Sequence, residues 1–283
     1  MPPCASRHTG FLVTETHHQS AALDLLQPAV LVRSPFAADA ANLIDVYRPQ
    51  NPTVAFSARD LRSPGIADAV QAATHGGFGC VVRSPGGRVV AYDSGAVVID
   101  HIMSLPLRGS GPAGVFAENA HHHLAVLRSL CKADLRVGEV EDEYCPGEFS
   151  INVGGTAKVV GSAQRVTSRA ALFSTVVQVE MTDRVRDVLI AVSAALGYPL
   201  RASSIAGLAE VEPGLGVAVV ADALRTDYRI RLSLRDTQLP ETLAAHLRGA
   251  GSAKQGELFH VDDWARAHPW PPVSHAVGTG MDV

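Results

Sequence analysis

Short runs of β-branched residues, separated by turn sequences, dominate the middle of this 283-residue chain. "FGCVVRS", "GRVVAYD" and "AVVIDHIMSL" follow one another between residues 78 and 105, with Pro-Gly-Gly and Asp-Ser-Gly at the joints. Such runs predict successive strands, and "GGTAKVVGSAQRV" and "LFSTVVQVEM" add two more. Because strands and helices do not alternate regularly, the pattern predicts an α+β fold, with a mixed, mostly antiparallel sheet flanked by helices, rather than a doubly wound fold.

Besides "SAALDLLQPAVLV" (20–32), which is expected to be a short helix that runs into extended chain, three segments are predicted to be helices, and a change in composition sets the expected organisation. The segments are "PFAADAANLIDVY" (35–47), the amphipathic "IADAVQAATHGG" (66–77) and the longest, "FAENAHHHLAVLRSLCKA" (116–133). From Asp183 onward the chain is Ala-rich and helical in pattern. We expect a main unit over residues 1–182, a small helical C-terminal part over 183–250, and a tail over 251–283 that packs in part or is mobile.

Composition excludes several classes of protein. The formal net charge of −4 and the lack of a Lys/Arg-rich block argue against a nucleic-acid binder. No apolar run approaches the roughly 18 residues of a membrane span, and the start lacks a secretory pattern. The scattered Cys4, Cys80, Cys131 and Cys145 do not form a disulfide framework. These observations predict a cytoplasmic, reduced protein with free thiols.

Two suggestive motifs are set aside. "GSGPAG" (109–114) matches a dinucleotide fingerprint, but the acidic residue that should follow the next strand, Asp134, precedes it. "HHH" (121–123), with His17 and His18 upstream, suggests a metal site. Consecutive helical residues point about 100° apart, so three in a row cannot face one ion. A solvated helix face is the preferred interpretation, and no metal site is predicted.

"RSPGGRVVAYDSG" (83–95) places two glycines between two strands. Backbone N–H groups of a glycine turn can cradle a carboxylate, a phosphate or a carbonyl oxygen. An ordinary hairpin turn explains the same residues, and the sequence alone favours it.

The most informative stretch is "EYCPGEFSINVGGTAKVVGSAQR", with Cys145 before a Pro-Gly pair and Lys158 in an apolar strand. A neighbouring cation lowers the pKa of a thiol and makes it a nucleophile. A Gly-Gly hairpin turn would place Lys158 opposite Ile151 and leave it roughly 20 Å from Cys145 at ~3.3 Å per residue. The two can meet only if "YCPG" folds back over the sheet. A buried thiol and a snorkelling lysine are the competing interpretation.

Four blocks together resemble a known family. "RPQNPTVAFS", "VVRSPGGRVVAYDSG", "EYCPGEFSINVGGTAKVVGSAQRV" and "AALFSTVVQV" resemble, in order and spacing, the lipoate–protein ligase A / octanoyltransferase family of the biotin/lipoate protein ligase superfamily. The likeness covers roughly residues 45–220, and "YCPG" is most similar to the branch that transfers octanoyl groups through a cysteine. It implies a ligase-like catalytic domain with a tunnel for an eight-carbon acyl chain.

The resemblance also implies roles for individual residues. Residues 1–182 would form the acyl-transfer domain, with Cys145 as the nucleophile and Lys158 holding the acyl carbonyl. The substrate-binding residues that it implies are Arg83, Ser84, Gly86, Gly87, Tyr92, Gly161, Ala163 and Gln164. We expect Lys158→Ala to abolish transfer and to leave the fold intact.

Departures from the family pattern bear on the reaction. ATP-using ligases typically have an arginine pair, three glycines and His-Asp, whereas this chain has "RSPGG" and Tyr92. The resemblance therefore implies transfer of octanoyl or lipoyl between carrier proteins without a cofactor, through a Cys145 thioester. The implied partners are lipoyl domains of 2-oxoacid dehydrogenases and the glycine-cleavage H protein. Two alternatives stay open: an ATP-dependent lipoate–protein ligase and a non-catalytic acyl-binding paralogue.

Overall fold

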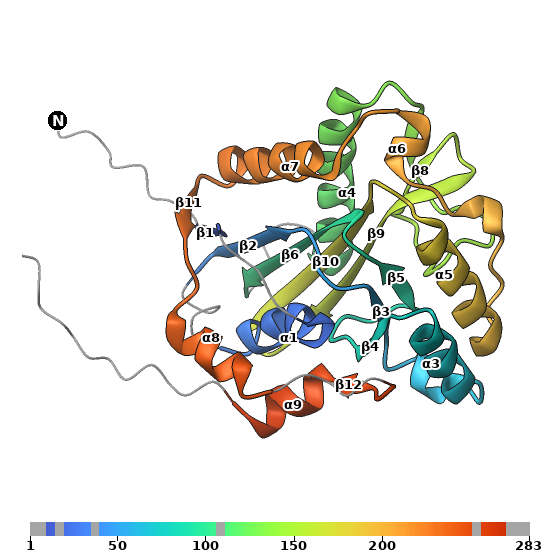
Figure 1. Ribbon diagram of the computed structural model, residues 1–283. Helices are drawn as coiled ribbons and strands as arrows, with labels where there is room; N and C mark the ends of the chain where they lie inside the picture. The colour runs from blue at the N-terminus through green and yellow to red at the C-terminus, as the bar shows by residue number, and fades with distance from the viewer. Residues whose placement is uncertain (1–9, 15–19, 35–39, 106–110, 251–255, 270–283) are drawn as a thin grey trace, which may run out of the picture.

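The protein is described by a computed structural model that covers residues 10–14, 20–34, 40–105, 111–250 and 256–269 (Figure 1). Its centre is a mixed sheet of eight strands. In spatial order these are β11 (Leu234–Thr237), β1 (Gly10–Val13), β2 (Asn42–Tyr47), β6 (Ala96–Ser104), β10 (Ala170–Gln178), β9 (Ala157–Val166), β8 (Ile151–Val153) and β7 (Leu135–Val137).

A second, smaller sheet lies beside the first. Its order is β12 (Phe259–His260), β4 (Gly79–Val82), β3 (Thr53–Phe56) and β5 (Val90–Tyr92). In the large sheet β1 is parallel to both of its neighbours, and every other pairing is antiparallel. The predicted α+β fold with a mixed, mostly antiparallel sheet is therefore confirmed.

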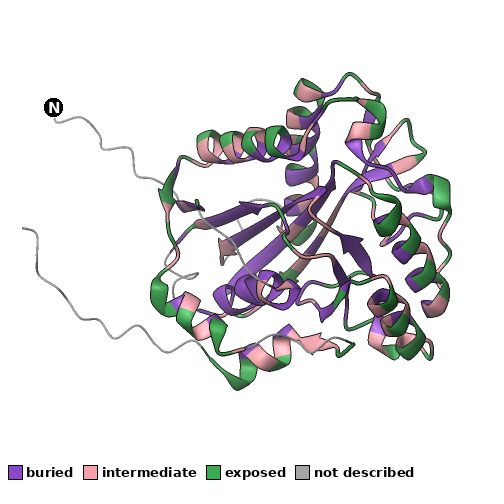
Figure 2. Ribbon diagram, viewed as in Figure 1, coloured by how far each residue is buried: buried purple, intermediate pink, exposed green. Residues whose placement is uncertain are grey.

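Helices cover both faces of the large sheet and enclose two cores (Figures 1 and 2). On one face α4 (Gly111–Leu130) and α7 (Val217–Arg231) pack over Val97 and Ile99 of β6. On the other face Val98 and Ile102 pack with the small sheet and α1 (Ala21–Leu31). Successive residues of a strand point to opposite faces, so one buried strand serves both cores.

The remaining helices frame this second face. α3 (Ile66–His75) and α5 (Asp183–Leu196) pack against each other, while α1 contacts both α8 (Glu241–Arg248) and α9 (Val261–Ala267). Most of residues 183–250 are helical, including the short α6 (Leu208–Val211), and this segment also supplies edge strand β11. The division into units stays a prediction. None of the helices among the described residues combines the length and hydropathy that crossing a membrane requires.

The strand predictions over residues 78–105 are confirmed as β4, β5 and β6, and the longest helix as α4. The helix predicted over 35–47 is wrong where the structure describes it, because residues 42–47 form β2. This strand runs between β1 and β6, with Ile44 facing one core and Leu43 the other. Burial on both faces removes the alternation that would have revealed a strand. Residues 35–39 lie outside the described residues.

The hairpin that carries Lys158 differs by one residue from the predicted register. Val153 pairs with Ala157, so the turn holds Gly154, Gly155 and Thr156, and Lys158 lies opposite Asn152 instead of Ile151. Both glycines adopt positive φ, at 59° and 75°. A three-residue turn moves the pairing by one position relative to a two-residue turn.

Candidate active site

Cys145 lies in the loop between β7 and β8, which folds back over the large sheet. Its φ is 43°, in the left-handed region that non-glycine residues seldom adopt. Such a conformation persists only where surrounding contacts fix it.

Lys158 supplies three of these contacts. Its side chain is 1% exposed, and its Nζ lies 2.7 Å from the Cys145 carbonyl oxygen, 3.1 Å from that of Tyr144 and 3.2 Å from Oε1 of Glu143. The "YCPG" segment thus folds back onto Lys158, which the sequence analysis set as the condition for the two groups to meet. The ammonium meets the backbone carbonyl of Cys145, however, and no hydrogen bond joins it to the thiol.

Glu143 is a residue that sequence reasoning missed. It is fully buried and accepts hydrogen bonds from Val140 N, Gly147 N and Ser150 Oγ in addition to Lys158. A buried carboxylate is stable only when it is paired and hydrogen-bonded. Glu143 satisfies both conditions and thereby ties the whole loop to β9. The run of acids from 139 to 143 made it look like part of a solvated surface.

The Cys145 thiol lies beside two hydrogen-bond donors from the segment that joins β4 to β5 in the small sheet. The backbone N–H of Arg88 lies 3.2 Å from Sγ, and Nη2 of Arg83 lies 3.7 Å from it. Burial raises the pKa of the Cys145 thiol, but the charges of Arg83 and Lys158 together with these hydrogen bonds outweigh it and lower the pKa below its ordinary value. In contrast, burial raises the pKa of Cys80. The lowered pKa favours the thiolate of Cys145, which is the nucleophilic form.

The Gly86-Gly87 turn packs directly against the Cys145 thiol. Gly87 has a φ of 97°, and a Cβ placed on it would lie 2.7 Å from Cys145 Sγ. Arg83 holds the turn by donating to the carbonyls of Gly86 and Arg88. The segment is thus more than the ordinary hairpin turn that the sequence alone favours.

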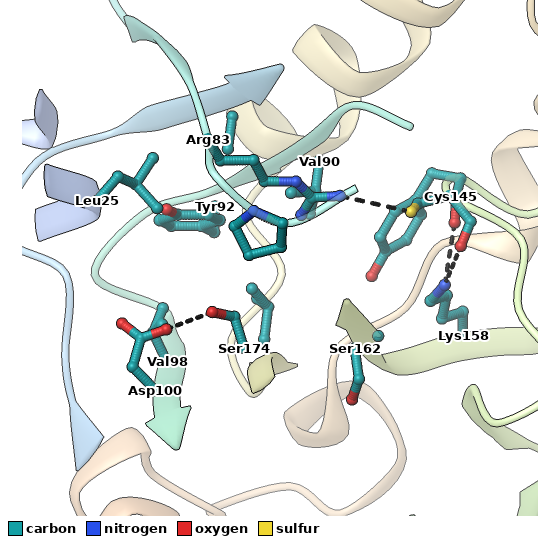
Figure 3. A pocket seen from close by; sticks show the side chains of 15 residues that line it. Leu25, Arg83, Val90, Tyr92, Val98, Asp100, Cys145, Lys158, Ser162 and Ser174 are labelled. Atoms are coloured by element: carbon teal, nitrogen blue, oxygen red, sulfur yellow. Dashed lines mark hydrogen bonds between the residues drawn. The ribbon is translucent and has the colours of Figure 1, made fainter. Parts of the chain in front are cut away.

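An apolar cavity, which we call the inner cavity, runs from Cys145 between the two sheets (Figure 3). Arg83, Tyr144 and Lys158 surround its mouth at Cys145, and apolar side chains from α1, β3, β5, β6 and β10 line its length. Among those side chains are Leu25, Ala55, Val90, Val98 and Val176.

A second, wider hollow, the outer cavity, opens to solvent on the other side of Cys145. Phe116 of α4 and Phe149 stack at its wall, with ring centroids 6.1 Å apart. Cys145, Lys158 and Ser162 line both cavities. The thiol therefore lies at the junction of an enclosed apolar space and an open one.

Most of the remaining predicted binding residues line one of these two cavities. Tyr92 and Gly161 line the inner cavity, and Gly86, Gly87, Ala163 and Gln164 line the outer one. A Cβ on Gly161 would lie 2.7 Å from Cε of Lys158, so glycine leaves room for that side chain. Ser84 is buried but lines neither cavity.

The histidine run is only partly the solvated face that the sequence predicts. His121 is exposed, but His123 is 1% exposed, and its Nε2 lies 2.9 Å from the Tyr228 hydroxyl between α4 and α7. Burial lowers the pKa of His123 to about 3, so it stays neutral. No group of three His, Cys, Asp or Glu side chains among the described residues could hold a metal ion.

Solved structures with the same architecture identify the fold. Lipoate–protein ligase A bound with ATP matches with a TM-score of 0.68 and 20% identity, over 85% of this chain and 93% of its own. The putative lipoate protein ligase from T. acidophilum with bound lipoic acid matches with a TM-score of 0.66 and 19% identity, over the same shares. The chain has the lipoate–protein ligase fold. This confirms the fold that the sequence resemblance implied.

Curated proteins named as octanoyl- or lipoyltransferases are similar in sequence to part of this chain. An octanoyl-[GcvH]:protein N-octanoyltransferase from Exiguobacterium sibiricum is 31% identical over 117 residues, and one from Geobacillus kaustophilus is 30% identical over 113. A lipoyl-[GcvH]:protein N-lipoyltransferase from Listeria monocytogenes is 29% identical over 117 residues. The matched segments span about 40% of this chain and of each relative. No family model matches the chain.

Proposed function

We propose that this protein is an acyltransferase that moves an octanoyl or lipoyl group between lipoyl-carrying proteins through a thioester on Cys145. The observation that carries the proposal is the position of the Cys145 thiol, whose pKa neighbouring charges lower, where an enclosed apolar cavity meets an open one. The inner cavity has the apolar lining that an acyl chain needs, and the wider outer cavity gives the lysine side chains of donor and acceptor access to the thiol.

The reaction divides into two attacks. The Cys145 sulfur attacks the acyl carbonyl carbon of the donor, a C–S bond forms, the bond to the donor lysine nitrogen breaks, and that nitrogen leaves as an amine with the thiol's proton. The acceptor lysine nitrogen then attacks the thioester carbon, a C–N bond forms, the C–S bond breaks, and the sulfur of Cys145 leaves as the thiol with the proton that the amine gives up. An enclosed apolar site favours aminolysis because it excludes water from the intermediate.

Arg83 and Lys158 take different parts in this proposal. An ammonium has three N–H donors, and those of Lys158 are directed to Glu143 and to two loop carbonyls. Lys158 accordingly fixes the loop and adds positive charge near the thiolate. The guanidinium of Arg83 and the N–H of Arg88 already lie beside Sγ and are the nearest donors for the negative charge that develops on the carbonyl oxygen.

Partners follow from the relatives. Their names identify octanoyl and lipoyl groups on GcvH as what they act on. We extend this to the present chain: the glycine-cleavage H protein and lipoyl domains of 2-oxoacid dehydrogenases serve as donor and acceptor. Because the acyl group arrives already linked to a carrier, the reaction needs no ATP and no other cofactor.

A transfer assay tests the proposal against its alternatives. The protein is incubated with octanoylated H protein and an unmodified lipoyl domain, with and without ATP, and the intact mass of the lipoyl domain is followed. Octanoylation without ATP supports the transferase. Modification from free octanoate only when ATP is present would establish the ligase instead. Bound fatty acid without either activity would establish the acyl-binding paralogue.

A further inference from the structure

The inner cavity ends in polar groups. Asp100 and Ser174 line it at the end opposite Cys145, with Tyr92 beside them (Figure 3). Asp100 and Ser174 are register partners on β6 and β10, and the Ser174 hydroxyl donates to Oδ1 of Asp100. We call Tyr92, Asp100 and Ser174 the distal polar cluster.

Two atoms of this cluster lack a partner. Asp100 is 4% exposed and Tyr92 is 1% exposed, yet neither Oδ2 of Asp100 nor the Tyr92 hydroxyl has a hydrogen-bond partner among the described residues. A buried polar group without a partner costs about 1–3 kcal/mol. Both atoms belong to side chains that line the cavity, so a ligand in the cavity can supply the missing hydrogen bonds.

The charge state of the cluster limits what it can bind. Burial, with Asp45 adding to it, raises the pKa of Asp100 to about 7, while the Ser174 hydroxyl that donates to Oδ1 and the nearby Tyr47 act in the opposite direction. Behind it, burial and the nearby Asp45 and Asp100 raise the pKa of Asp24 to about 8. With a pKa of about 7, Asp100 is neither fully ionised nor fully protonated near neutral pH, so its carboxyl group can form a hydrogen bond with an uncharged polar group.

The distance across the sheet suits a chain of medium length. Gly161 on β9 lies beside Lys158 and pairs with Val176 on β10. The next strand in the sheet is β6, which carries Asp100. Two strand spacings of ~4.8 Å across the sheet, and two residues of ~3.3 Å along β6 from Val98 to Asp100, place Asp100 roughly 12 Å from Gly161. An acyl chain whose carbonyl carbon lies at Cys145 would therefore bring its far end to the distal polar cluster.

We propose that the inner cavity selects acyl chains that carry an uncharged hydrogen-bonding group, a hydroxyl, at or near the distal end. The inference rests on the proposed function for the orientation of the chain. A methyl-ended chain leaves Asp100 and Tyr92 without partners, whereas a hydroxyl donates to Asp100 and accepts from Tyr92. A site built to bind a substrate hydroxyl discriminates strongly against an analogue that lacks it.

Calorimetric titration of the whole protein with octanoate, 8-hydroxyoctanoate and 8-aminooctanoate tests the inference without any covalent step. We expect the hydroxylated acid to bind at least ~10-fold more tightly than octanoate, from one satisfied buried group. Equal or weaker binding of the hydroxylated acid, tightest binding of the amino acid, or binding of none of the three would overturn it.

Two variants and one control assign the preference to the cluster. Asp100→Leu should remove or reverse the preference, and Asp100→Asn, which keeps both size and hydrogen bonding, should retain it. His101→Leu changes a buried polar residue on the opposite face of the same strand and should leave it unchanged. An unchanged preference in folded Asp100→Leu would contradict the assignment to Asp100.

Failure of this inference differs from failure of the proposed function. Synthetic alkyl thioesters of octanoic and 8-hydroxyoctanoic acid can transfer their acyl group to Cys145, with the alkyl thiol as the leaving group. Adducts formed faster from octanoyl than from the hydroxylated chain would contradict the inference and support the transferase. Absence of any adduct, together with tighter binding of the hydroxylated acid, would support the inference and contradict the transferase.

Discussion

The ammonium of Lys158 lies 2.7 Å from the backbone carbonyl oxygen of Cys145, and both belong to a loop-to-strand contact buried from solvent. The same ammonium pairs with the fully buried Glu143. Lys158 thus connects β9 to the loop that holds the thiol in its left-handed conformation. Its contribution to any reaction cannot be separated from this structural contribution by a single substitution.

Lys158→Ala is therefore expected to destabilise the protein, which changes the sequence-based expectation of an intact fold. Removing one partner of a buried ion pair costs about 3–5 kcal/mol because the other charge is left unpaired. Chemical denaturation monitored by circular dichroism measures the loss. The double variant Lys158→Met with Glu143→Gln removes both charges and should recover most of the stability. Equal stability of Lys158→Ala and the wild type would contradict the structural role.

Gly87→Ala is expected to abolish the reactivity of Cys145. A Cβ at this position would lie 2.7 Å from Sγ, and the positive φ disfavours alanine. The rate of alkylation of Cys145 by iodoacetamide, followed by mass spectrometry, measures the effect. Gly86→Ala is the matched control, since a Cβ there meets nothing within 4 Å. Identical alkylation rates in the two variants would show that the turn does not contact the thiol.

Arg83→Met is expected to raise the pKa of Cys145. The guanidinium is the largest of the influences that lower this pKa, and it also donates to Sγ. Because the thiolate is the reactive form, the pH profile of alkylation should move to higher pH. Arg88→Met serves as the control: Arg88 contacts the thiol through its backbone N–H, and its side chain lies over the Tyr198 ring. A profile that moves as far in Arg88→Met as in Arg83→Met would contradict this account.

Asp24→Asn is expected to reduce the dependence of stability on pH. The pKa of Asp24 is raised to about 8 from 3.8, so the folded state holds a proton that the unfolded state releases. The free energy of unfolding therefore falls as the pH rises from 3.8 to about 8. His101 and His123, with pKa values of about 3, are neutral in the folded state between pH 6.5 and 8. Chemical denaturation at pH 6.5 and at pH 8 should therefore show a smaller fall in the free energy of unfolding for Asp24→Asn than for the wild type. An equal fall in both proteins would contradict the raised pKa of Asp24.

The sequence was sufficient to predict several strands of the two sheets and to single out the segment from Cys145 to Lys158 as the candidate reactive segment. The strands β4, β5 and β6 were predictable because each is a β-branched run bounded by turn residues. Cys145 and Lys158 were recognisable as a candidate nucleophile and a cation in one segment. Their approach was predicted only as a condition, because nothing in the sequence fixes the direction in which "YCPG" folds.

Other features could not be predicted because they depend on contacts distant in the sequence. Strand β2 looked helical because its Ala-rich flank hides a strand buried on both faces. Glu143 was hidden in an acidic run, and its burial follows only from the fold of the loop. Asp100 interrupts the apolar run of β6, a signal that a buried polar site was present. That it ends the inner cavity becomes evident only when β9, β10 and β6 are aligned.

The central claim, that Cys145 carries the acyl group, is tested most directly by intact-mass measurement of the protein after incubation with octanoylated H protein. The account predicts an added mass of one octanoyl group that hydroxylamine removes and that Cys145→Ser lacks, while Cys80→Ser retains it. Efficient acyl transfer by Cys145→Ser, without any adduct on the wild-type chain, would contradict the account.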